Sequence, residues 1–141
     1  MLPEPLTEAD VRRVIDAALA EDVGTGDLTS LSVIPADTRF AGTLAAREAL
    51  VVAGLPIAGM VFSAVSPAIA WQPEVQDGQR LAAGAVLARV EGPARALLTA
   101  ERTALNILQH LSGIATLTRR YVDAIEGTGT VLLDTRKTLP G

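Results

Sequence analysis

Residues 127–141 have the sequence GTGTVLLDTRKTLPG, and this stretch decides the fold class that we expect for the chain. Glycines at 127 and 129 end a long helical pattern, and the aliphatic residues 131–133 then predict a buried strand that runs through Asp134. A helix, a glycine turn and an aliphatic strand are typical of an α/β barrel or a doubly wound sheet. One such unit cannot close a sheet, so the sequence predicts a second domain that has only begun.

The helical pattern before this strand covers residues 94–126. Its main apolar stripe has helical spacing and consists of Leu97, Ala104, Leu108, Leu111, Ala115, Val122 and Ile125. Few helices are this long, so we predict a break or kink at Ser112-Gly113. The same position is the expected boundary between a first domain, residues 1–111, and a second domain, residues 112–141.

The residues before the long helix predict a mixture of helices and strands. A helix capped by Thr7 is expected through Leu19, and a polar loop is expected over residues 21–29. The other expected elements are strands at 39–47, at 51–53, around Trp71 and at 85–91, a helix at 55–65 with Pro56 in its first turn, and a turn at 76–79. The expected fold class is therefore α+β.

The composition narrows the classes of protein to which the chain can belong. Lys and Arg number 12 against 16 Asp and Glu, so the net charge is −4, which argues against nucleic acid as a partner. The absence of cysteine excludes disulfides, cysteine-ligated zinc and thiol catalysis, and a reducing cytoplasm fits best. The first ten residues do not resemble a signal peptide, and no apolar run is long enough to predict a membrane span.

The first candidates for chemistry are Arg136 and Lys137, which follow the predicted strand at residues 131–134. Side chains at the carboxyl end of a parallel strand face the mouth in which α/β folds bind ligands. Arg offers a planar fork and Lys a compact charge, so the pair suits carboxylates or phosphates, with Asp134 or Thr135 as a brace. The alternative is that both cations are solvated residues of a loop.

Arg102 is the second candidate, because it lies within the apolar helical pattern. Asn106 and His110 follow at intervals of four residues, so the three form a narrow polar ribbon on a helix that we expect to be buried. A buried Arg needs an anionic partner, which is either a ligand or an acid elsewhere in the fold. His110 is the single histidine, and we expect it to be structural rather than an acid–base catalyst.

Two further patterns carry less information about function. Glu21, Asp22 and Asp27 have the charge to bind a divalent cation, but they lack the spacing of an EF-hand, and a solvated loop is expected. Residues 75–92 resemble the turn-and-strand repeat of lipoyl and biotinyl carrier domains. Those domains carry a lysine that becomes modified, and the chain has no lysine before Lys137. The resemblance to carrier domains therefore concerns the fold and not the function.

Four segments together resemble the quinolinate phosphoribosyltransferase family closely. They are residues 20–29 (AEDVGTGDLT), 101–106 (ERTALN), 110–116 (HLSGIAT) and 134–141 (DTRKTLPG), in the order and at the separations of that family. The resemblance implies an open-faced α/β sandwich, similar to the hammerhead or barrel-sandwich shape of carrier domains, over residues 1–111. It also implies that residues 112–141 are the first helix and strand of a truncated phosphoribosyltransferase barrel.

The resemblance implies an activity as well as a fold. The family transfers phosphoribosyl from phosphoribosyl pyrophosphate to quinolinate with loss of CO2, giving nicotinate mononucleotide for NAD synthesis, and Mg²⁺ accompanies the pyrophosphate. By this resemblance Arg102 reaches a quinolinate carboxylate across a homodimer interface and acts in catalysis with Lys137. Thr135, Arg136 and Lys137 line the same pocket, and Lys137 also meets phosphoribosyl pyrophosphate. The resemblance leaves a higher oligomer open.

The family's barrel continues well beyond the position of Gly141, and its later part contributes further basic residues and the acids that manage magnesium. We therefore expect the 141-residue piece alone to be inactive. Two other functions stay open from the sequence. One is a sister phosphoribosyltransferase, either one that uses nicotinate or the homologue found beside molybdate transport genes. The other is a non-catalytic binding or dimerisation module.

Overall fold

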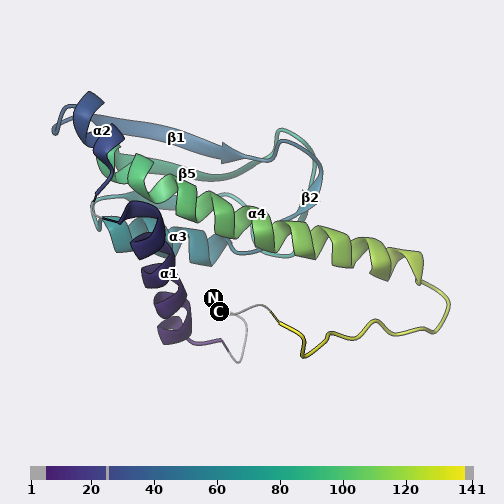
Figure 1. Cartoon of the computed structure of the whole chain (residues 1–141). Helices are drawn as coiled ribbons and strands as arrows, with labels where there is room; N and C mark the ends of the chain where they lie inside the picture. The colour runs from purple at the N-terminus through teal and green to yellow at the C-terminus, as the bar shows by residue number, and fades with distance from the viewer. Residues whose placement is uncertain (1–5, 25, 139–141) are drawn as a thin grey trace.

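The computed structural model of the chain describes residues 6–24 and 26–138 (Figure 1). Its elements are α1 (Glu8–Val23), α2 (Leu28–Val33), β1 (Arg39–Ala45), β2 (Leu50–Val51), α3 (Leu55–Val65), β3 (Ala70–Pro73), β4 (Arg80–Leu81), β5 (Val86–Pro93) and α4 (Ala94–Ala124). Helices combine with two small antiparallel sheets, which confirms the predicted α+β class.

The larger sheet has the strand order β1-β5-β3, and α3 and α4 lie together below it in Figure 1. The central strand is β5, whose Gly92 pairs with Phe40 of β1 and whose Val90 pairs with Trp71 of β3. Because β5 has a neighbour on each edge, it is the most buried of the strands. The strands predicted at 39–47, around Trp71 and at 85–91 are confirmed, with ends that differ by one or two residues.

The core is aliphatic apart from one aromatic pair. Phe62 of α3 is 2% exposed and stacks on Trp71 of β3, with ring centroids 5.3 Å apart. Gly59, one turn earlier on α3, allows this approach, because a Cβ there would lie 2.8 Å from two atoms of the Trp71 ring. The scarcity of aromatic residues in the sequence is therefore matched by a core made of packed Ile, Leu, Val and Ala side chains.

The helix predicted at 55–65 is confirmed, and a distant side chain caps it. The backbone N–H groups of Gly54 and Leu55 donate to the carboxylate of Asp77 at 2.8 and 3.0 Å. Asp77 belongs to the turn predicted at residues 76–79, and Pro56 occupies the first turn of the helix as expected. The turn therefore satisfies backbone donors that the helix itself leaves without partners.

The polar loop predicted at residues 21–29 is shorter than expected. The Thr7 cap is confirmed, because the Thr7 hydroxyl accepts from the N–H of Asp10 at 3.2 Å, but α1 continues to Val23. Asp27 then caps α2 by accepting from the N–H of Ser30 at 3.1 Å. The sequence indicated an earlier end because residues 21–29 are polar and contain glycines at 24 and 26, which interrupts the helical pattern. Thr25 lies outside the described residues.

The long helix α4 runs without interruption through Gly113, so the predicted break at Ser112-Gly113 is wrong. The Ser112 hydroxyl accepts from the N–H of Ala53 at 3.0 Å and donates to the Ala53 carbonyl at 3.2 Å. Thr116 accepts from the N–H of Val51 at 2.9 Å. Ser112, which indicated a helix end, therefore acts with Thr116 to hold α4 against β2 and the residues that follow it. The strand predicted at 51–53 is observed as the shorter β2.

We predict that Ser112→Ala lowers the free energy of unfolding by about 1–2 kcal/mol, because the Ala53 N–H and carbonyl both lose their partner in a partly buried position. Urea unfolding followed by circular dichroism measures this loss. The matched control is Ser32→Ala, which removes an exposed hydroxyl bonded only within α2 and should change the free energy by less than about 0.5 kcal/mol. Equal losses for the two variants would contradict the role of Ser112.

The strand predicted at residues 131–134 is not formed. After α4 the chain turns at residues 125–129, and residues 131–138 run back below α4 as an exposed segment without strand pairing (Figure 1, yellow). A strand needs a neighbour for its backbone hydrogen bonds, and neither sheet of the described residues includes this segment. The predicted division at residue 112 stays a prediction.

Candidate functional site

Arg102 lies on the exposed face of α4, and its side chain is 57% exposed. Asn106 and His110 are exposed as well, so the predicted polar ribbon exists, but the expectation that it is buried is wrong. The buried face of this part of α4 is formed instead by Ala100, Thr103, Ala104 and Leu108. Arg102 is therefore accessible to a ligand, and no catalytic role is assigned to His110.

Asp22, in the last turn of α1, forms an ion pair with Arg102. Its Oδ2 atom lies 3.2 Å from Nε of Arg102, and the Asp22 side chain is 30% exposed. The sequence predicted that Arg102 needs an anionic partner. It grouped Asp22 with Glu21 and Asp27, however, and gave no indication that Asp22 pairs with Arg102. No spacing signal joins α1 to α4, so this pair could be found only from the folded chain.

Asp27 lies at the start of α2, and its carboxylate is held by three hydrogen bonds. It accepts from the N–H and hydroxyl of Ser30 at 3.1 and 2.6 Å and from the hydroxyl of Thr99 at 3.3 Å. The bonds from Ser30 lower the pKa of Asp27 most, and the positive charge of Arg102 contributes to the same shift. Asp27 is thus a charged anchor between α2 and α4 in the neighbourhood of Arg102.

Thr135, Arg136 and Lys137 are exposed on the segment that follows α4. The backbone N–H of Lys137 donates to the Thr135 hydroxyl at 3.3 Å. Within residues 6–24 and 26–138, no ion pair or hydrogen bond joins this segment to Arg102. The predicted convergence of these cations with Arg102 stays a prediction.

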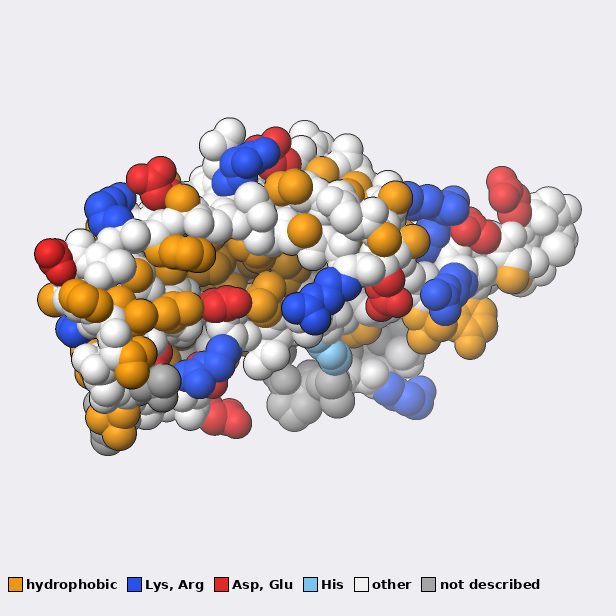
Figure 2. All heavy atoms as spheres, turned by 90° about the horizontal axis from the view of Figure 1, so that it is seen from above, with side chains coloured by type: hydrophobic (Ala, Val, Ile, Leu, Met, Phe, Trp, Pro, Cys, Tyr) orange, Lys and Arg blue, Asp and Glu red, His pale blue; other side chains and the backbone are white. Residues whose placement is uncertain are grey.

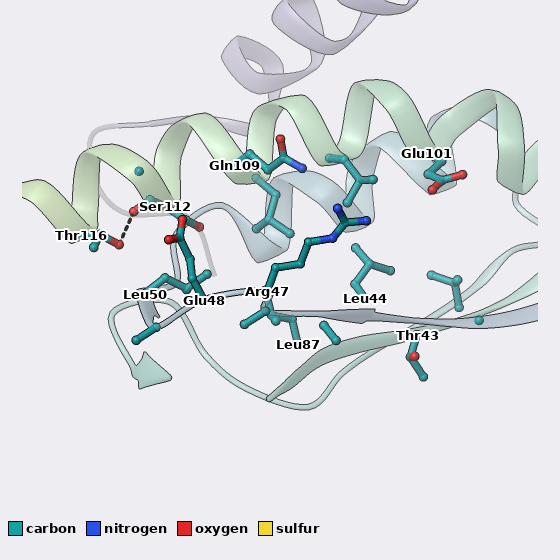
Figure 3. A pocket seen from close by; sticks show the side chains of 18 of the residues that line it. Thr43, Leu44, Arg47, Glu48, Leu50, Leu87, Glu101, Gln109, Ser112 and Thr116 are labelled. Carbon is teal, nitrogen blue, oxygen red and sulfur yellow. Dashed lines mark hydrogen bonds between the residues drawn. The ribbon is translucent and has the colours of Figure 1, made fainter. Parts of the chain in front are cut away.

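A groove of about 930 Å³ lies between β1 and α4. Hydrophobic side chains such as Leu44, Leu87 and Leu105 line it, and Figure 2 shows a hollow that contains hydrophobic side chains with charged side chains beside it. Arg47, from the loop after β1, points into the groove, while Glu101 reaches it from α4 (Figure 3). Sequence reasoning did not identify this groove, because its walls come from segments far apart in the chain.

The fold defines a class of protein: a small α+β domain in which one long helix lies beside a three-stranded antiparallel sheet and presents exposed basic groups. The chain belongs to the quinolinate phosphoribosyl transferase family, because its residues 27–112 match the N-terminal domain of that family.

Known proteins similar to this chain agree with the family match. Nicotinate-nucleotide pyrophosphorylase [carboxylating] of Mycobacterium leprae is 45% identical over 133 residues, which are 92% of this chain and 47% of that protein. The chloroplastic protein of the same name from Oryza sativa is 41% identical over 94% of this chain and 35% of its own length. The crystal structure of NadC from Streptococcus pyogenes superposes with a TM-score of 0.91 at 38% identity, over 98% of this chain and 49% of that one.

The chain thus spans about half the length of the relatives that it matches, or less. The family resemblance drawn from four sequence segments is confirmed. Of the described helices, none combines the length and the apolar character that a membrane crossing requires.

Proposed function

We propose that this chain is the N-terminal part of a quinolinate phosphoribosyltransferase. The enzyme joins the phosphoribosyl group of phosphoribosyl pyrophosphate to quinolinate and releases pyrophosphate and CO2, leaving nicotinate mononucleotide for NAD synthesis. The observation that carries the proposal is the match of residues 27–112 to the family's N-terminal domain. It is supported by relatives whose names state this activity and that align with more than nine-tenths of the chain.

Arg102 binds one carboxylate of quinolinate in this proposal. Its guanidinium is exposed on a helix whose opposite face is buried. A ligand that is not part of this chain can therefore reach it. A planar guanidinium matches a carboxylate through two parallel hydrogen bonds. We place this contact across a homodimer interface, in which Arg102 of one subunit completes the site of its partner.

Thr135, Arg136 and Lys137 line the same pocket from the other subunit. All three are exposed on a segment without regular structure, which is the state expected of pocket residues whose remaining wall is elsewhere. Lys137 contributes a compact positive charge that reaches phosphoribosyl pyrophosphate, and Arg136 contributes a fork for a carboxylate or phosphate. Cations held where negative charge develops stabilise the transition state of such a transfer.

Mg²⁺ accompanies phosphoribosyl pyrophosphate in this proposal. Over the described ranges 6–24 and 26–138, no three acidic or histidine side chains converge as a metal site would require. No resident magnesium ion is therefore assigned to the described residues, and no step is derived from one. Magnesium is commonly bound by substrate phosphates with few protein ligands, which is consistent with its arrival on the substrate.

The enzyme is expected to act in the cytoplasm, where a chain without cysteine needs no oxidising environment.

An assay with a chain extended to the length of its relatives tests the function. We expect it to convert quinolinate, phosphoribosyl pyrophosphate and Mg²⁺ to nicotinate mononucleotide with release of labelled CO2, whereas the 141-residue chain alone gives no product. Nicotinate in place of quinolinate is the control acceptor, and preference for nicotinate would replace the proposal with that of a sister transferase.

A further inference from the structure

The ion pair between Asp22 and Arg102 uses one particular part of the guanidinium. The 3.2 Å contact joins Oδ2 of Asp22 to Nε, the nitrogen at the base of the fork. An Arg side chain carries five N–H donors, of which Nε has one and the two terminal nitrogens have four. This contact is an ion pair rather than a directed hydrogen bond, and it restrains the base of the group while the terminal nitrogens stay available to bind a carboxylate in the bidentate manner.

Asp27 adds a second negative charge near the same guanidinium. Its three hydrogen bonds to Ser30 and Thr99 hold it in place, and it is close enough for Arg102 to help lower its pKa. Asp22 lies in the last turn of α1, and Asp27 caps the start of α2. Arg102 is thus paired with Asp22 and has a second carboxylate, that of Asp27, in its neighbourhood.

Asp22 is a poor residue for the helix that carries it. It lies in the last turn of α1 next to Glu21, and this turn contains no basic residue. Negative charge at the C-terminus of a helix opposes the helix dipole, so α1 by itself would be better served by a neutral residue there. The favourable interaction of Asp22 is its ion pair with Arg102 on α4. The role of Asp22 is therefore its effect on Arg102 and not the stability of α1.

We propose that Asp22 is a positioning residue for Arg102, holding the guanidinium through Nε so that its terminal nitrogens face the carboxylate of quinolinate. This inference rests on the function proposed for Arg102. Asp22 does not touch the substrate, and its effect on the reaction passes through the orientation of one side chain. A misplacement of about 1 Å at a substrate-binding group is enough to slow a reaction by one or two orders of magnitude.

The test is Asp22→Asn in a chain extended to the length of its relatives. We expect the KM for quinolinate to rise about tenfold, since orientation of the anion-binding group is lost, while the KM for phosphoribosyl pyrophosphate and the melting temperature stay unchanged. The matched control is Asp16→Asn on the same helix, which breaks an exposed ion pair with Arg12 at 2.8 Å and should change none of these quantities.

A double variant separates positioning from a general structural role. In an Arg102→Ala background, Asp22→Asn should cause no further rise in KM, because the residue through which it acts is gone. An additive effect, or an unchanged KM for Asp22→Asn alone, overturns the inference while leaving the role of Arg102 intact. If Arg102→Ala itself keeps the normal KM for quinolinate, Arg102 does not bind quinolinate. Both the role proposed for Arg102 and the role inferred for Asp22 are then wrong.

A second variant applies if Asp22→Asn lowers the melting temperature. Asp22→Glu keeps the negative charge and lengthens the side chain by one methylene, so it should restore the melting temperature and part of the KM effect. The same KM for the Glu and Asn variants would show that the charge does not position Arg102, and would overturn the inference.

Discussion

Arg102→Ala is expected to lower kcat/KM for quinolinate by about 10²- to 10³-fold in a chain extended to the length of its relatives, the range found when one stabilising donor is removed from an active site. The stability of the domain should change little, since the side chain is 57% exposed and its ion pair with Asp22 is solvated. Steady-state rates at varied quinolinate, together with thermal unfolding, measure the two effects separately.

The physical reason for the large effect is the geometry of the guanidinium. It binds a carboxylate with two parallel, charge-assisted hydrogen bonds, and neither water nor a shorter side chain reproduces both. Arg102→Lys keeps the charge but loses the fork, so its activity should lie between those of wild type and Arg102→Ala. The control is Arg12→Ala on α1, which removes a solvated cation paired with Asp16 and should leave kcat/KM unchanged.

Mixing two defective variants tests whether the site is shared between subunits. Arg102→Ala and Lys137→Ala remove residues that the proposal assigns to different subunits of one site. Random mixed dimers then contain one intact site each, and activity should recover to about a quarter of that of wild type. No recovery on mixing would place both residues in sites formed within single subunits, and the dimer proposal would be abandoned.

Phe62→Ala is expected to lower the free energy of unfolding by about 3–5 kcal/mol, one of the largest losses that a single substitution in this core can cause. Phe62 is 2% exposed and is among the largest fully buried side chains of the described residues. Its ring stacks on Trp71 at 5.3 Å and lies where α3 meets β3. The variant loses both the burial of the ring and its contacts with the indole.

Urea unfolding monitored by Trp71 fluorescence and circular dichroism measures this loss. Phe40→Ala is the matched control, because Phe40 is 56% exposed at the edge of the groove and its removal should cost less than about 0.5 kcal/mol. Phe62→Leu should lie between the two, since it keeps a large aliphatic side chain in the same space. Similar losses for Phe62→Ala and Phe40→Ala would mean that the packing around Phe62 is not the main source of stability.

Local sequence signals predicted most of the fold. Helix 55–65 was predicted at its observed ends, because apolar spacing and Pro56 both act within one turn. Ser112-Gly113 misled for the opposite reason: serine and glycine are weak helix formers on their own, but Ser112 bonds Ala53 and the helix continues. The strand predicted at 131–134 failed because strand formation depends on a neighbour.

The site was predicted in part. Arg102 was identified because a cation within an apolar helical pattern needs an anionic partner. Its side chain is exposed in the structure, so an anion can reach it. Its exposure and its pairing with Asp22 were not predicted, since apolar periodicity shows that a helix packs against something without showing which face a partner leaves open. The groove between β1 and α4 likewise has no sequence signal.

The sequence by itself determined the α+β class and the aliphatic core, because each depends on residue types at short, regular spacing, and it determined the family through four matching segments. Only the tertiary structure decided that α4 is continuous, that Asp22 meets Arg102 and that Asp77 caps α3. These contacts join residues distant along the chain. Their energies are comparable to local preferences and can reverse them, and no pattern within one segment encodes the partner that folding brings to it.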